Sequence, residues 1–126
     1  MDGPLFRRDF MLLTLNENKD FRRIYARGKS MAHPILVTYA MRNRLGITRY
    51  GVTTSKKIGK AVKRNRARRI IKAAVQLQPH LPCGYDLIFV ARARTTKVKS
   101  TDIFYVMKKQ IKMLTQEENY PSGGKL

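Results

Sequence analysis

The side chains best suited to chemistry in this sequence are cations, and they gather in one stretch. Between Ser55 and Val75 there are nine basic residues and no acidic residue. Like charges one helical turn apart repel by roughly 0.2–0.5 kcal/mol per pair, so this density indicates a surface that a polyanion neutralises. A merely solvated basic face is the alternative, and the lack of carboxylates disfavours it. The nine residues are Lys56, Lys57, Lys60, Lys63, Arg64, Arg66, Arg68, Arg69 and Lys72.

The second half of the same stretch has the spacing of a packed helix. Apolar residues recur there at i, i+3, i+4, i+7 and i+8, which predicts one buried face on a helix over about Ala61–Leu77. Asn65, Arg68, Arg69 and Lys72 are predicted on or near the opposite face, with Arg66 on one flank. The buried set is Ala67, Ile70, Ile71, Ala74 and Val75.

Aromatic side chains provide a second kind of binding chemistry. Phe21 and Tyr25 are one turn apart on a predicted helix, and Tyr39 lies on a predicted strand. Each could simply belong to the core, and Phe21 is the most apt to do so. A base stacked on an aromatic ring contributes roughly 1–3 kcal/mol, so aromatics beside a basic surface favour a single-stranded RNA cleft. Duplex DNA is disfavoured because no recognition-helix arrangement is apparent.

Composition supports a nucleic-acid partner. The 126 residues predict one domain, 1–126, and the net charge is +19 with a pI of about 10.8. Sixteen Lys and Arg but no Asp or Glu lie between Phe21 and Tyr85. No apolar run approaches the roughly 18 residues of a membrane span, and the N-terminus does not resemble a signal peptide. We therefore expect no membrane partner. A single cysteine, Cys83, cannot form an internal disulfide, so we expect a reducing cytoplasm.

A catalytic constellation is not apparent in the sequence. His33 and His80 are isolated beside prolines, and Cys83 lies near His80 without a third partner. No paired carboxylates, metal-ligand cluster or glycine-rich phosphate loop occurs. We therefore expect no catalytic residue and no metal site in this polypeptide.

The order of predicted elements is helix, two strands, helix, strand, helix, which indicates an α+β sandwich. Asn18 is the expected N-cap of the first helix and Gly28 its stop. The first two strands are expected to pair as a hairpin, and the third is expected to be buried on both faces. Residues 1–15 are expected to be extended or loosely ordered, and 116–126 a flexible tail. The element ranges are 16–28, Ile35–Met41, Arg49–Thr54, Ala61–Leu77, Tyr85–Ala91 and Thr101–Leu114.

Three segments together resemble the protein subunit of bacterial ribonuclease P. They are FRRIYARGKS (Phe21–Ser30), GVTTSKKIGKAVKRNRARRIIKAA (Gly51–Ala74) and DLIFVAR (Asp86–Arg92). The second contains the arginine-asparagine-arginine motif of that family, here Arg64-Asn65-Arg66, after SKKIG. The resemblance covers about Asn18 to Leu114.

The resemblance implies an αβββαβα two-layer sandwich. It adds a short strand near Ser30, makes the sheet four-stranded, and gives the βαβ unit an unusual left-handed crossover. It also implies a ribonucleoprotein endoribonuclease, in which one protein joins one ribonuclease P RNA that cleaves the 5′ leader from precursor tRNA. The RNA is the catalyst and uses Mg²⁺, whereas the protein is a non-catalytic subunit that binds RNA.

Site residues follow from the same resemblance. The leader cleft would use Phe21, Tyr25 and Tyr39, with Lys56 and Lys57 nearby. The catalytic RNA would face Arg64, Asn65, Arg66, Arg68, Arg69 and Lys72. Two other classes stay open from the residues alone: a ribosomal or assembly protein, and a general single-strand or DNA-binding module.

Overall fold

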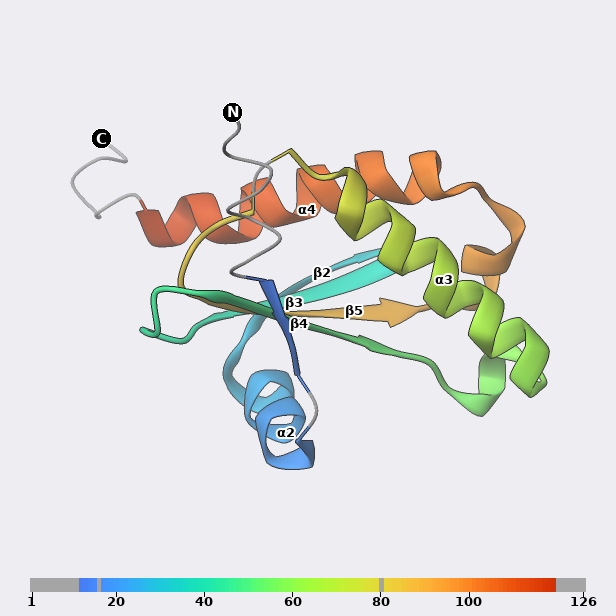
Figure 1. The fold of residues 1–126 in the computed structure, drawn as a ribbon, viewed down its shortest axis with the longest axis horizontal. Helices are drawn as coiled ribbons and strands as arrows, with labels where there is room; N and C mark the ends of the chain where they lie inside the picture. Colours follow the sequence, from blue (N-terminus) through green and yellow to red (C-terminus); the bar gives the residue numbers. More distant parts are fainter. Residues whose placement is uncertain (1–11, 16, 80, 120–126) are drawn as a thin grey trace.

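A mixed β-sheet forms the middle of the molecule, with two helices on one face and one on the other (Figure 1). The computed structural model describes residues 12–15, 17–79 and 81–119. The strands are β1 (Leu12–Thr14), β2 (Lys29–His33), β3 (Leu36–Arg42), β4 (Thr48–Thr53) and β5 (Tyr85–Ala91). The helices are α2 (Asn18–Arg27), α3 (Ala61–Leu77) and α4 (Ser100–Asn119), with short 3₁₀ turns η1 (Lys56–Ile58) and η2 (Ala93–Lys97).

The sheet has the strand order β1-β4-β5-β3-β2. β5 pairs parallel to β4 and antiparallel to β3, so the expected hairpin between β3 and β4 is wrong. The physical reason is the apolar run Tyr85–Ala91, whose side chains are nearly all buried on both faces. Such a strand is most stable at the centre of a sheet, and it lies between the two strands that precede it in sequence.

The four strands implied by the family resemblance are all present, including the short β2 that begins next to Ser30. The connection from β4 through α3 to β5 is left-handed (Figure 1), unlike nearly all parallel crossovers. A fifth strand is added by Leu12–Thr14, which pairs in parallel with β4. Leu12–Thr14 is thus extended, which is one of the two states expected for residues 1–15, whereas residues 1–11 lie outside the described part of the chain.

Helix ends differ from the expectation in two places. α2 begins at Asn18 itself and its N-cap is Glu17, so Asn18 is not the cap, while Gly28 ends the helix as expected. A β-carbon at Gly28 would lie 2.6 Å from the Ile24 carbonyl oxygen, which is why glycine fits this stop. α4 continues to Asn119, so residues 116–119 are helical and not part of a tail; residues 120–126 lie outside the described range.

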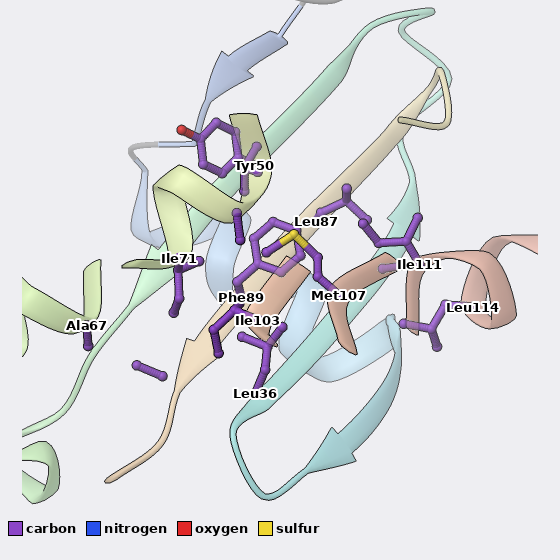
Figure 2. Close-up of a cluster of buried hydrophobic side chains, with 14 of the residues drawn as sticks. Leu36, Tyr50, Ala67, Ile71, Leu87, Phe89, Ile103, Met107, Ile111 and Leu114 are labelled. Atoms are coloured by element: carbon purple, nitrogen blue, oxygen red, sulfur yellow. The ribbon is translucent and has the colours of Figure 1, made fainter. Parts of the chain in front are cut away.

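The main core lies between the sheet and the pair α3 and α4 (Figure 2). Leu87 and Phe89 of β5 meet Ile71 of α3 and Met107 of α4, all fully buried. The apolar face predicted for α3 is confirmed, with four of its five residues buried and Ile70 packed at the margin.

One buried polar contact fixes α4 to the sheet. Gln110 accepts a hydrogen bond from the Thr38 hydroxyl at 2.6 Å and donates to the carbonyls of Met31 and Leu36 at 3.1 and 3.0 Å. Because a buried amide without partners is costly, these three bonds fix where α4 sits over β2 and β3. In the part of the chain that is described, no helix combines the length and the apolar character needed to cross a membrane.

Candidate RNA-binding surfaces

Of the described helices, α2 is the one on the opposite face of the sheet (Figure 1). Its Phe21 and Ile24 side chains pack with strand residues of that face. Ile24 is fully buried against Ile88 of β5. Phe21 lies over Gly51 of β4, where a β-carbon would be only 2.6 Å from the Phe21 Cζ atom. The glycine therefore lets the ring approach the backbone of β4 directly.

The three aromatic residues predicted for a cleft lie together on this face. The Tyr25 and Tyr39 ring centroids are 4.9 Å apart in an edge-to-face arrangement, and the Phe21 and Tyr25 centroids are 6.5 Å apart. The Tyr25 hydroxyl donates to the Thr53 Oγ1 atom at 3.1 Å, which fixes the ring toward the end of β4. Phe21 and Tyr39 are half-buried, and Tyr25 is 39% exposed. We refer to Phe21, Tyr25 and Tyr39 as the aromatic cleft, after the single-strand cleft that the sequence predicts for them.

An ion-pair network that the sequence analysis missed holds α2 onto the sheet. Asp86, fully buried in β5, accepts bonds from Arg49 Nε and Nη2 at 2.8 and 2.7 Å. Arg23 of α2 reaches the same carboxylate at 3.3 Å and also Asp20 at 3.1 Å, and Asn43 donates to Asp86 at 2.8 Å. The Asp86 carboxylate is thus satisfied on both oxygens, as a buried charge requires.

The network changes the pKa of Arg49. Its hydrogen bonds to Asp86 raise the pKa of the Arg49 guanidinium above its ordinary value, against the opposing effect of burial. The one signal in the sequence was an acidic residue inside the apolar run Tyr85–Ala91. An acid buried in a central strand needs cationic partners, so that signal could have predicted the network.

The two lysines predicted beside the cleft lie just after β4. Lys56 and Lys57 are exposed in η1, where the Ser55 hydroxyl caps the turn by accepting from the Lys57 amide at 3.3 Å. Thr53, which binds Tyr25, precedes them by three and four residues. The lysines therefore follow the end of the strand to which the aromatic cleft is attached.

The basic residues of α3 fall into two groups. Asn65, Arg66, Arg69 and Lys72 are exposed, and apart from Arg66 they line an open groove together with Arg68 and Val62. Arg64 and Arg68 are partly buried.

Each partly buried arginine is tied to the loop before α3. Arg64 donates to the Gly59 carbonyl at 3.0 Å, and Arg68 donates to Thr54 Oγ1 at 3.0 Å and to Asn65 Oδ1 at 3.2 Å. Arg68 is therefore only partly on the outer face that the periodicity predicted for it, because Thr54 draws its guanidinium toward β4.

The residues considered for catalysis do not converge. His33 is exposed and accepts a bond from the Ile35 amide at 3.2 Å, and Cys83 is an exposed free thiol. His80 lies outside the described residues. Within the described ranges, no three His, Cys, Asp or Glu side chains are grouped so that they could hold a metal ion.

Comparison with known proteins gives a consistent match. The family model described as Ribonuclease P matches residues 12–115. A "Ribonuclease P protein component" from Clostridium botulinum is 44% identical over 91 residues, covering 71% of this chain and 82% of the relative. Another from Clostridioides difficile is 40% identical over 100 residues, covering 78% and 88%.

A solved structure is similar as well. The RNase P protein of Staphylococcus aureus has a TM-score of 0.69 to this chain at 30% identity, covering 79% of this chain and 93% of that one. The chain belongs to the Ribonuclease P family, whose relatives named here are protein components of that endoribonuclease.

Proposed function

We propose that this protein binds ribonuclease P RNA through α3 and the 5′ leader of precursor tRNA through the aromatic cleft. In doing so it promotes endonucleolytic removal of the leader to give the mature tRNA 5′ end. The RNA performs the chemistry with its Mg²⁺ ions, and one protein joins one RNA. The observation that carries the proposal is the aromatic cleft: three neighbouring rings, partly open to solvent, on a face fixed by buried ion pairs.

The cleft suits a single strand. Tyr25 presents part of its ring to solvent while its hydroxyl is held by Thr53, so a base can stack on it without displacing the side chain. Base stacking does not depend on base identity, so leaders of different sequence can be held. Lys56 and Lys57 beyond Thr53 supply charge for the phosphates of the same strand.

α3 suits a structured RNA partner. Arg66, Arg69 and Lys72 are exposed with Asn65, and this helix contains no acidic residue. Arginine binds phosphate oxygens in bidentate fashion, and the asparagine amide can donate to a phosphate or a 2′-hydroxyl. Arg64 and Arg68, bonded to Gly59 and Thr54, hold the start of the helix in place for that contact.

The net positive charge of the protein explains how it could assist cleavage. Two polyanionic RNAs must approach each other, and a protein of net charge +19 between them lowers their repulsion. Magnesium performs part of the same task, so the protein lowers the magnesium concentration that cleavage requires. Only the precursor has a leader to occupy the cleft, so the protein favours precursor over mature tRNA.

The test is cleavage of a precursor tRNA by a bacterial ribonuclease P RNA at low magnesium, with and without this protein. We expect correct 5′ cleavage to be rescued by the protein and no cleavage by the protein alone. Tight, salt-sensitive RNA binding without rescue would overturn the proposal and favour a ribosomal or generic RNA-binding protein.

A further inference from the structure

A second basic groove lies at the other end of the aromatic face, away from Lys56 and Lys57. It is a cavity of about 550 Å³ at the junction of α2, the start of β2 and the end of β3. None of the described residues that line it is acidic. The lining residues are Arg27, Lys29, Ala40, Met41, Arg42 and Arg44.

The strand register places this groove relative to the cleft. Arg42 pairs with Tyr85 at the start of β5, whereas Thr53, which holds Tyr25, pairs with Val90 near its end. Five strand residues separate the two levels, or about 17 Å along the sheet. Met41 belongs both to the groove and to the cluster that contains Phe21 and Tyr39, so the groove adjoins the aromatic cleft.

The edge of the sheet is also open at this point. β2 begins at Lys29, which pairs with Ala40, so among the described strands Met41 and Arg42 have a neighbour only on the β5 side. Because no described strand covers this edge, a phosphate chain can come close to the cations beside it.

A neighbouring cavity differs from the groove, because acidic residues line it together with basic ones. That cavity shares Arg42 but contains Glu17 and Asp20, which pair with Lys19 and Arg23. In the groove, by contrast, no described carboxylate forms an ion pair with Arg27 or Arg44, which are both exposed. Arg27 and Arg44, which have no described carboxylate partner and lie beside an aromatic cleft, are complementary to phosphates.

We infer that this groove binds the phosphate backbone of the single-stranded leader after it has crossed the aromatic cleft. This inference rests on the proposed function, since it extends the path of the same strand. A strand held at Lys56 and Lys57 would pass Tyr25 and Tyr39 and reach Arg27 and Arg44 only when it is long enough. The groove therefore makes precursor affinity depend on leader length.

The experiment compares wild type with the double variant Arg27→Gln, Arg44→Gln in the assembled holoenzyme. Precursor tRNAs with leaders that lengthen one nucleotide at a time are bound under fixed salt. We expect equal affinity for short leaders and, beyond a threshold length, a loss of roughly 3- to 10-fold in the variant. The double variant Arg27→Lys, Arg44→Lys should restore most of the affinity, because phosphate also accepts a point charge.

A matched control removes two exposed charges elsewhere, with Lys109→Gln and Lys112→Gln on α4. Its precursor affinity should follow that of the wild type at every leader length. A loss that is equal for all leaders, together with weaker assembly on the catalytic RNA, would overturn the inference and place the catalytic RNA in the groove. Unchanged affinity for every leader would overturn it in favour of a solvated surface.

A second measurement separates this inference from the proposed function. The isolated protein is titrated with single-stranded RNA oligonucleotides of increasing length at several salt concentrations. For long oligonucleotides, losing two phosphate contacts should lower the slope of log affinity against log salt by about 1.4 in the glutamine variant. Failure of cleavage rescue by the wild type would refute the proposed function, whereas an unchanged slope would refute the groove.

Discussion

Arg49 and Asp86 lie directly opposite each other on the parallel strands β4 and β5, joined by two hydrogen bonds of 2.8 and 2.7 Å. Arg23 of α2 adds a third cationic contact to the same carboxylate. The pair therefore does more than join two strands, because it also provides the fixed charge to which α2 is attached. α2 contributes two of the three rings of the aromatic cleft, so the geometry of the cleft depends on this buried ion pair.

Replacing Asp86 by alanine should be strongly destabilising. Arg49 and Arg23 would lose their main partner in a partly buried position, and breaking a buried pair typically costs about 3–5 kcal/mol. Chemical denaturation should show this loss in the free energy of unfolding. Asp102→Ala is the matched control: among the described residues its exposed carboxylate accepts one hydrogen bond, from the Lys99 amide, so the expected cost is about 1 kcal/mol. Similar losses for both variants would contradict the role of the network.

Gly51→Ala should disturb the cleft more than the fold. The added methyl would lie 2.6 and 2.7 Å from the Phe21 Cζ and Cε1 atoms, so the ring must move away from β4. Overpacking of this kind costs roughly 1–3 kcal/mol, and precursor binding should weaken while catalytic-RNA binding is retained.

The double variant Gly51→Ala, Phe21→Leu separates the clash from other effects. If the ring is what the methyl meets, leucine should recover much of the lost stability but not the precursor affinity. A Gly51→Ala protein that binds precursor as well as wild type would show that Phe21 does not contribute to the cleft.

Much of this fold could be predicted from local patterns. The bounds of α3 and β5 were predicted correctly because each has one strong pattern: a single apolar helical face for α3 and an unbroken apolar run for β5. The pairing of β3 with β4 was wrong because hairpin reasoning uses sequence proximity, whereas burial places β5 between them. β1 could not be predicted since a three-residue strand has too little periodicity.

The site residues also include some that local patterns predict and some that depend on tertiary structure. Phe21, Tyr25 and Tyr39 could be named as stacking candidates from their residue type and the basic composition. Only the family resemblance assigned them to one leader cleft, because nothing local predicts that a helix residue and a strand residue meet. The 4.9 Å contact of Tyr25 and Tyr39 depends on α2 lying on the sheet, and hence on the ion pairs of Arg23 and Asp86. The groove at Arg27 and Arg44 likewise unites residues from separate elements, which no spacing along the chain reveals.

Tyr25→Ala and Tyr39→Ala should each weaken binding of precursor tRNA and leave mature tRNA nearly unaffected. Loss of one stacked base corresponds to about 1–3 kcal/mol of binding free energy. Tyr25→Phe keeps the ring and removes only the bond to Thr53, so its effect should be small. Tyr105→Ala is the control, because Tyr105 is 67% exposed on α4, on the other face of the sheet. Equal losses for precursor and mature tRNA would mean that the cleft does not hold the leader.

Arg66→Ala and Arg68→Ala should have different consequences although they lie on one helix. Arg66 is exposed, so its loss should weaken catalytic-RNA binding and reduce the salt slope by about 0.9 without affecting stability. Arg68 also holds Thr54 and Asn65, so its loss should lower both RNA affinity and the free energy of unfolding. Assembly assays and denaturation on the same two proteins test the distinction. An Arg66→Ala protein with unchanged RNA affinity would remove α3 from the interface.

Anions should stabilise the free protein by binding at α3. The N-cap residue of α3, Lys60, provides no side-chain bond to the helix, and no acidic residue occupies the first turn to offset its dipole. Repulsion among its cations adds to this cost in the absence of RNA. An anion that binds the folded state stabilises it by mass action, so sulfate should raise the melting temperature and slow amide exchange in α3 more than in β5. Chloride at equal ionic strength controls for screening. Equal protection of α3 in the two salts would show that the helix is fully formed without a bound anion.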